Sequence, residues 1–320
     1  MKKLDLLCVG NAVADTGTRP VESLPRPGHL VLVGSIGLTA GGCAINSAIG
    51  AARLGLRVGV GTAVGRDAFG DFLERKLKTE GVDTRGLFRA KSGIQSSASV
   101  VAISRNGERS FLHVIGASGY MSDRDFPDSL LGRFRALHLS GFFLLPRMDG
   151  APARRLLRRA LALGLATSLD TCWDPQGRWN LLKMCLPFAE YYLPSIEEAR
   201  GTFGCRDPLQ IARKALALGV RQAVVLKMGA GGCFSLERGG LPIRIPAFRV
   251  KAVDATGAGD SFDAGFLVGI LRGLPLTKAL LLGNAAGALS VSGIGGQGAI
   301  RNLRQAKKLA GIGLAGSCKH

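Results

Sequence analysis

One short glycine-rich segment carries the residues most able to do chemistry on an anion. It runs Asp254-Ala-Thr-Gly-Ala-Gly-Asp-Ser-Phe-Asp-Ala-Gly-Phe266, with the small residues 257–259 directly before Asp260. Phe262 and Phe266, at i and i+4, indicate the inner face of a helix that begins here. Free N–H groups and the positive end of a helix form a natural phosphate site. Asp260 is then either a harmless helix-end charge or a base that accepts an alcohol proton beside a transferring phosphoryl group.

Two further motifs accompany this segment. Gly41-Gly-Cys-Ala-Ile-Asn-Ser-Ala48 stands at the expected start of a helix, and Val64-Gly-Arg-Asp-Ala-Phe-Gly70 is followed by Gly81-Val-Asp83. In this order the three motifs resemble the signatures of the ribokinase-like (PfkB) carbohydrate kinase family. The resemblance spans essentially the whole chain, from Gly10-Asn-Ala-Val-Ala-Asp15 to the segment that begins at Asn284. It is specific for the family and says little about the substrate.

The resemblance implies roles on the acceptor side of a kinase site. Asp260 would be the catalytic base that activates the acceptor hydroxyl. An anion hole for the developing phosphoryl charge would be formed by the backbone N–H groups of Gly257, Ala258 and Gly259. A sugar would be held by Asp15, Gly41, Gly42 and Asn46. The alternative for Asp15 is a turn residue, and for Asn46 a hydrogen bond at a helix start.

The nucleotide side departs more from the family pattern. Lys227-Met-Gly-Ala-Gly-Gly232 follows an apolar strand, where the resemblance implies a glycine turn under the nucleotide. Many relatives have Thr where Lys227 stands, and Lys227 either reaches a phosphate or is solvated. Asn284 either faces the nucleotide base or makes an ordinary polar contact of a helix. The residues expected to bind ATP are Ser195, Lys227, Gly229, Gly232 and Asn284.

The resemblance also implies metal ions. In Leu193-Pro-Ser-Ile-Glu-Glu198, Ser195 replaces the Asn of the family's Asn-x-x-Glu element, whereas Glu198 remains. Mg²⁺ would be held by Glu198 through water, because Mg²⁺ in phosphoryl transfer keeps several waters. Potassium, which some relatives bind, would lie near Asp254 and Thr256 and the loop 293–298.

A rhythm of short apolar runs and amphipathic helices positions these motifs. Strands are expected at residues 6–9, 58–64, 136–139, 166–169, 191–193 and 223–226. Strands that alternate with helices and are almost wholly apolar predict a doubly wound α/β fold on a mainly parallel sheet.

Two stretches, 17–38 and 94–115, break this rhythm, and the second contains the hairpin turn signal Asn106-Gly107. We expect them to form a small antiparallel β lid on a single ribokinase-like domain of residues 1–320.

Composition excludes several classes of protein. The net charge is +19, yet its densest run, Arg154 to Arg159, is interleaved with leucines and predicts the polar face of a helix. With three Tyr and two Trp, none in a basic stretch, we expect no nucleic-acid partner. The seven cysteines are scattered without a CxxC pair, which is typical of reduced thiols in the cytoplasm. No apolar run reaches the ~20 residues of a membrane span.

These observations predict a cytoplasmic kinase that transfers the γ-phosphoryl group of ATP to a hydroxyl, expected to be primary, of a sugar or sugar derivative. A nucleoside kinase of the same family is the alternative if the lid supplies an apolar lining. A sugar acid as acceptor would need a cation near Asp15, and Arg19 or Arg109 could serve. A catalytically silent ligand sensor is a further alternative, and a homodimer formed through lid edges stays open.

Overall fold

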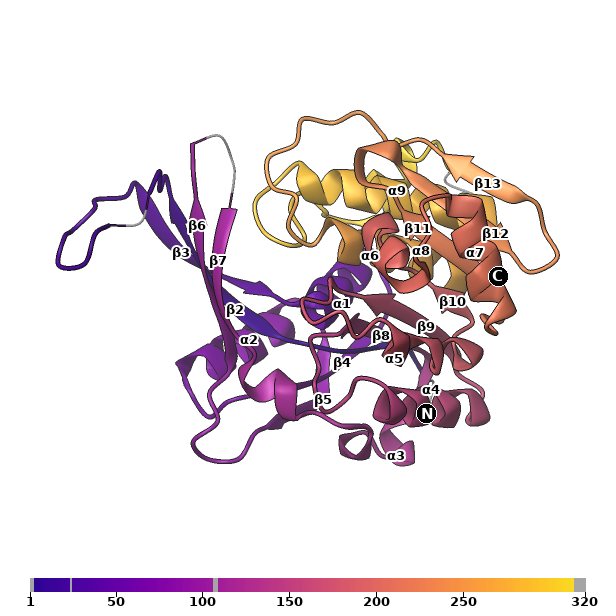
Figure 1. Ribbon diagram of the computed structural model, residues 1–320, viewed down its shortest axis with the longest axis horizontal. Coiled ribbons are helices and arrows are strands. Elements are labelled where there is room, and N and C mark those ends of the chain that lie inside the picture. The colour runs from indigo at the N-terminus through magenta and orange to yellow at the C-terminus, as the bar shows by residue number, and fades with distance from the viewer. Residues whose placement is uncertain (1–2, 24, 106–108, 314–320) are drawn as a thin grey trace, which may run out of the picture.

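A nine-stranded sheet forms the body of the computed structural model, which describes residues 3–23, 25–105 and 109–313 (Figure 1). From edge to edge the strands are β13 (Pro242–Ile245), β12 (Cys233–Glu237), β11 (Ala223–Lys227), β10 (Tyr191–Tyr192), β9 (Ala166–Thr171), β8 (Phe134–Phe142), β1 (Leu4–Val9), β4 (Val58–Val64) and β5 (Asp83–Arg89). All pairs from β11 to β5 are parallel, and β12 and β13 are antiparallel. The mainly parallel sheet is confirmed, while β5, β12 and β13 were not predicted.

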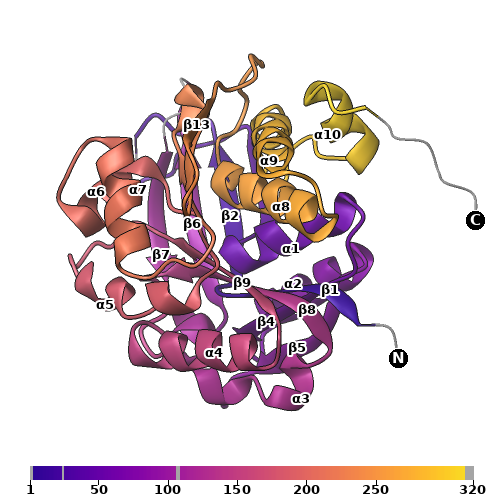
Figure 2. The same cartoon turned by 90° about the vertical axis from the view of Figure 1, so that its right-hand side faces the viewer.

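Helices cover both faces of this sheet, and the buried part of strand β1, residues 6–9, shows why successive residues there are apolar. Leu6 and Cys8 pack in one hydrophobic cluster, whereas Leu7 and Val9 pack in the other, because successive side chains of a strand point to opposite faces. The first cluster includes residues of α1 (Cys43–Arg53), α2 (Ala68–Thr79), α8 (Ala258–Leu271), α9 (Leu276–Val291) and α10 (Leu303–Leu309). The second includes residues of α3 (Asp128–Leu131), α4 (Ala151–Ala162), α5 (Asn180–Lys183), α6 (Ile196–Phe203) and α7 (Pro208–Ala217). Figure 2 shows α8 and α9 on one side of the sheet and α4 on the other.

Local signals account for the starts of several helices. The side chain of Asp67 caps α2 by accepting a hydrogen bond of 2.8 Å from the backbone N–H of Gly70. The arginines of α4 lie on its polar face, where Arg155 pairs with Asp123 at 2.7 Å and Arg159 with Asp128 at 2.7 Å. The basic run therefore belongs to a helix face that carries ion pairs.

A second, four-stranded sheet projects from the body (Figure 1) and has the order β3 (Ser35–Gly41), β2 (Val13–Arg19), β6 (Ser97–Ile103), β7 (Arg109–Val114). We call it the small sheet. Its outer pairs are antiparallel, but β2 and β6 pair in parallel, which the hairpin signal did not predict. The apolar run 30–33 is not a strand, and Leu30 and Leu32 are 85% and 87% exposed. The predicted turn Asn106-Gly107 lies outside the described residues.

None of the helices in the described parts of the chain combines the length and the apolar character that crossing a membrane requires.

Candidate active site

The candidate site lies where the direction of the strand order changes. From β1 the chain adds β4 and β5 on one side and then returns to add β8 and β9 on the other. Open α/β sheets bind ligands at such a switch point, beyond the carboxyl ends of their strands. Asn11 follows β1 there, Asp170 lies near the end of β9, and Lys227 ends β11.

Asp260 lies in the first turn of α8 and is 8% exposed. Its Oδ2 accepts a hydrogen bond of 2.8 Å from Nδ2 of Asn46, in α1. Oδ1 of Asn46 in turn accepts one of 2.6 Å from Nε2 of Gln297. Burial raises the pKa of Asp260, against the hydrogen bond from Asn46 and the positive charge of Lys227. Asp260 and Asn46, which were predicted from separate motifs, are therefore in direct contact. Gln297 orients the side-chain amide of Asn46.

The turn before Asp260 is shaped by a glycine that no other residue could replace. Gly257 caps α8 with a left-handed φ of 67°, and a Cβ on it would lie 2.6 Å from the carbonyl oxygen of Gly296. The first N–H groups of a helix have no partner within the helix. In this turn the N–H of Ala258 makes a long bond, 3.4 Å, to the carbonyl oxygen of Ala255. This is the local geometry that an anion hole at residues 257–259 requires.

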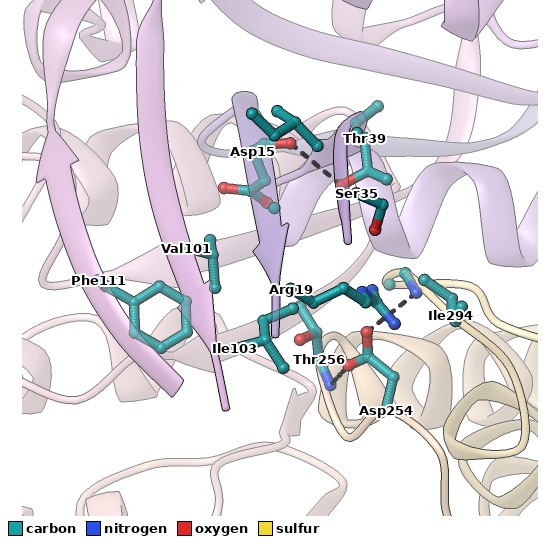
Figure 3. Close-up of a pocket in the computed structure, with 16 residues that line it drawn as sticks. Asp15, Arg19, Ser35, Thr39, Val101, Ile103, Phe111, Asp254, Thr256 and Ile294 are labelled. Atoms are coloured by element: carbon teal, nitrogen blue, oxygen red, sulfur yellow. Dashed lines mark hydrogen bonds between the residues drawn. The ribbon is translucent and has the colours of Figure 1, made fainter. Parts of the chain in front are cut away.

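A cavity of about 290 Å³ opens between the small sheet and the loops at residues 254–256 and 294–296 (Figure 3). Asp15, Arg19 and Asp254 contribute charged groups to its lining. Val101, Ile103 and Phe111 form an apolar wall. Asp260 and Asn46 do not line the cavity but lie next to its floor. Gly296 lines it, and a Cβ on Gly296 would lie 2.1 Å from Oδ1 of Asn46.

Glycines allow the other residues that were predicted to bind the sugar to pack closely against their neighbours. Asp15, in β2, lies beside Gly41 of β3, where an added Cβ would come within 2.0 Å of its Oδ2. Burial raises the pKa of Asp15 to about 6, although a hydrogen bond with Ser99 opposes the shift. Gly42 precedes α1 with a φ of 89°, and its Cβ would lie 2.6 Å from the carbonyl oxygen of Asn11. The side chain of Arg109 lies outside what the structure describes.

Asp254 connects two loops through hydrogen bonds. Its Oδ1 accepts a hydrogen bond of 2.8 Å from the backbone N–H of Thr256, and its Oδ2 one of 3.1 Å from that of Gly295. The loops at 254–256 and 293–298 are therefore side by side, as the potassium hypothesis requires of them.

Lys227 is neither solvated nor directed at open space. Its ammonium group lies 2.8 Å from Oδ1 of Asp170 and 2.9 Å from Oδ2 of Asp263, and its side chain is 10% exposed. The two carboxylates hold its pKa well above the usual value for lysine despite burial. The alternative of a solvated Lys227 is therefore wrong, because the lysine is part of a buried ion-pair network.

Ser195 and Glu198 cap α6 reciprocally. Oγ of Ser195 accepts from the backbone N–H of Glu198, and Oε2 of Glu198 accepts from the N–H of Ser195 at 2.9 Å and from Oγ1 of Thr171 at 2.9 Å. Both bonds to the carboxylate use Oε2, and Oε1 accepts no hydrogen bond from the described residues. An oxygen ligand in this position fits a hydrated Mg²⁺ ion.

The remaining residues of the predicted ATP side have structural contacts of their own. Nδ2 of Asn284 donates to the carbonyl oxygens of Ile245 and Pro246, at 3.3 and 3.2 Å. Gly232 has a φ of 84°, and a Cβ on it would lie 2.0 Å from the carbonyl oxygen of Ile245. Gly229 has a φ of 55° with nothing within 4 Å of an added Cβ.

Sequence reasoning missed two side chains of the site: Asp263, which contacts Lys227, and Gln297, which contacts Asn46. Asp263 is three residues after Asp260 on the same helix, so helical spacing could have indicated that both face the sheet. Gln297 carries no such signal, because its partner Asn46 is 251 residues away in the chain.

Comparison with known proteins places this fold and site in one class. A family model described as pfkB family carbohydrate kinase matches residues 3–302. The chain therefore belongs to this family, and it is a phosphotransferase with an alcohol group as acceptor.

Individual relatives agree with this classification at low identity. A 5-dehydro-2-deoxygluconokinase of Listeria monocytogenes is 27% identical over 308 residues, 91% of each chain. A ribokinase of Mus musculus is 27% identical over 300 residues, which cover 91% of this chain and 88% of the mouse protein. The structure of Arabidopsis thaliana ribokinase complexed with ribose and ATP superposes with a TM-score of 0.81 at 24% identity, covering 96% of this chain and 99% of that one. A putative ribokinase II from E. coli in complex with ATP and Mg²⁺ gives a TM-score of 0.81 at 21% identity, covering 96% and 98% of the two chains. The ribokinase-like fold predicted from the sequence is confirmed.

Proposed function

We propose that this protein transfers the γ-phosphoryl group of ATP to a primary hydroxyl of a sugar or sugar derivative bound in the cavity at Asp15. The contact between Asp260 and Asn46, at the start of α8 and beside the floor of that cavity, carries this proposal. Asp260 lies at the positive end of α8, close to where a phosphoryl group would be stabilised, and this is where a base for phosphoryl transfer is needed.

Each group then has a defined role. Asp15 accepts hydrogen bonds from hydroxyls of the acceptor, and Gly41 leaves room for its carboxylate. Asp260 accepts the proton of the attacking hydroxyl, with its carboxylate oriented by Asn46. The N–H groups of residues 257–259 stabilise the negative charge that develops on the transferring phosphoryl group.

ATP and magnesium belong to the other half of the site. Relatives with this fold bind ATP and Mg²⁺, which supports ATP as the donor. Glu198 would hold Mg²⁺ through water, and the ion would neutralise charge on the phosphates when bound. Ser195, Lys227, Gly229, Gly232 and Asn284 were predicted to contact ATP; the structure ties Ser195, Lys227 and Asn284 to protein groups. Gly229, with open space around it, is therefore a better candidate for close approach to the nucleotide than Gly232, which packs against the backbone of Ile245.

One basic group in the cavity supports a sugar acid as acceptor, although the lining also holds the carboxylates of Asp15 and Asp254. Arg19 places a guanidinium group in the same cavity as Asp15, an arrangement that suits a hydroxylated acid. A relative that is 27% identical acts, by its name, on 5-dehydro-2-deoxygluconate, which is such an acid. The apolar wall of Val101, Ile103 and Phe111 supports the alternative of a purine nucleoside.

The test measures ADP production from Mg-ATP with a panel of sugars, sugar acids and nucleosides, for the wild type and Asp260→Asn. A rate that depends on one acceptor and is lost in the variant supports the proposal and identifies the acceptor class. Arg19→Met separates the acids from the rest, since it should raise KM for a sugar acid and leave that of a neutral sugar nearly unchanged. ATP binding without turnover of any acceptor would contradict a kinase and favour a ligand sensor.

Two further proposals concern potassium and assembly. Asp254 joins the two loops that would surround potassium, so the rate in KCl should exceed that in tetramethylammonium chloride if this ion binds there. Val100, Leu112 and Val114 are exposed apolar residues of the small sheet outside the cavity lining, and they support a homodimer through this sheet, which light scattering would test. A kinase that depends on ATP is expected in the cytoplasm.

A further inference from the structure

A buried ammonium group lies behind Asp260. Nζ of Lys227 is 2.8 Å from a carboxylate oxygen of Asp170 and 2.9 Å from one of Asp263, and these three side chains come from β11, β9 and α8. The lysine side chain passes beneath the glycine-rich turn. A Cβ on Gly259 would lie 3.4 Å from Nζ and 3.6 Å from Cε. The end of the Lys227 side chain is therefore packed directly against Gly259.

The lysine faces three carboxylates at once. One oxygen atom from each of Asp170, Asp260 and Asp263 lies within 4.8 Å of the others, and all three residues are buried. Buried like charges at this separation disfavour ionisation of one another. The pKa values of all three are raised, and in each case the charge of Lys227 acts against the rise.

No other side chain in the described parts of the chain brings a positive charge to this cluster. Nε2 of His138 lies 3.8 Å from Asp263, but burial lowers the pKa of His138 to about 3, so the ring is neutral at pH 7. The titratable and charged groups around Asp260 and its cluster are Cys8 of β1, Cys43 of α1, His138 of β8 (which faces Asp263), Asp170 and Cys172 at the end of β9, Glu198 of α6, Lys227 of β11 and Asp263 of α8 itself. Lys227 is the cation among them.

We propose that Lys227, held by Asp170 and Asp263, is the counter-charge that keeps the carboxyl group of Asp260 ionised for proton abstraction. Lys227 is then a positioning residue that acts through Asp260. This differs from a contact between Lys227 and a phosphate of ATP, because the ammonium is already bound by two carboxylates. The proposal rests on the role of Asp260 as base in the proposed function.

Removing the ammonium group should make Asp260 harder to ionise. In Lys227→Met the cluster keeps its carboxylates and loses its cation, so the acid limb of the pH profile of kcat/KM should move up by about one pH unit. Below that limb the rate should fall about tenfold, and KM for ATP should change little. Lys227→Gln, which keeps a hydrogen-bond donor without charge, should move the limb in the same direction.

A charge-balanced variant separates electrostatics from packing. Lys227→Met combined with Asp170→Asn removes one charge of each sign, so the acid limb should return to within about half a pH unit of the wild type. An unshifted limb with a large rise in KM for ATP would overturn the proposal and make Lys227 a phosphate ligand. An unshifted acid limb with normal kinetics and a lowered Tm would also overturn the proposal and give Lys227 a purely structural role.

A measurement without turnover distinguishes failure of this proposal from failure of the proposed function. Protein labelled with ¹³C at the aspartate carboxyl carbons is titrated by NMR, and the signal of Asp260 is the one that Asp260→Asn removes. Its titration midpoint should lie about one pH unit higher in Lys227→Met than in the wild type, and near the wild-type value in the double variant. Equal midpoints in all three proteins would refute the coupling, whether or not an acceptor is phosphorylated.

Discussion

Asp260→Asn should separate catalysis from stability in this kinase. The substitution keeps the shape of the side chain, and the carbonyl oxygen of the new amide can still accept the hydrogen bond that Nδ2 of Asn46 donates at 2.8 Å. What it removes is the ability to take a proton from the acceptor hydroxyl. A general base contributes about 100- to 10,000-fold to a rate, which corresponds to about 3 to 5 kcal/mol of activation free energy.

Stability should not fall with activity. Burial raises the pKa of Asp260 above its value in the unfolded chain, so at pH 7 ionisation of this carboxyl group disfavours the folded state. A neutral amide at the same position does not incur this loss. The Tm of Asp260→Asn at pH 7 should therefore equal or exceed that of the wild type, even though kcat is reduced by two to four orders of magnitude.

The assay couples ADP release to NADH oxidation with the acceptor found in the panel, and Tm is measured by differential scanning calorimetry. Asp149→Asn is the matched control, because Asp149 is also a buried aspartate with a raised pKa but lies away from the cavity, where it accepts from the backbone N–H of Phe143 at 2.9 Å. Its kcat should stay within about twofold of the wild type. If Asp260→Asn kept more than about a tenth of wild-type kcat, Asp260 would not be the base.

Three further predictions follow from the same contacts. Gly41→Ala would place a Cβ 2.0 Å from Oδ2 of Asp15, so the carboxylate must turn away, and steady-state kinetics should show KM for the acceptor raised about tenfold or more with a smaller change in kcat. Asn46→Ala removes the donor to Asp260 and leaves Nε2 of Gln297 without its acceptor, so urea unfolding should show a loss of about 1 to 3 kcal/mol together with a reduced kcat. Burial raises the pKa of Asp149 to about 7, so this carboxyl group ionises more easily in the unfolded chain than in the folded one. The free energy of unfolding should therefore decrease through this group as the pH rises from about 4 to about 7, and Asp149→Asn should lessen that decrease. Identical profiles of Tm against pH, from pH 4 to pH 8, in the wild type and the variant would contradict this.

Short-range patterns in the sequence determined much of the fold. The nearly continuous apolar runs of β1 and β4 predicted buried parallel strands, because strands covered on both faces have mostly apolar side chains pointing to either face. The polar face of α4 was also predicted, since it depends on residues about one turn apart. Family resemblance added the fold, and with it the expectation that Asp260 and Asn46 share a site.

Only the tertiary structure decided which distant groups meet. Lys227 and Asp263 are 36 residues apart in the chain, and Asn46 and Gln297 are 251 apart, so no local pattern could pair them. The parallel pairing of β2 with β6 was likewise invisible to a hairpin signal that reports only adjacent strands. Strand order brings the ends of β9 and β11 beside the first turn of α8, and burial there makes the charge of Lys227 matter to Asp260. A lysine in the sequence has a charge, but its electrostatic effect depends on neighbours and on exclusion of water, which exist only in the folded chain.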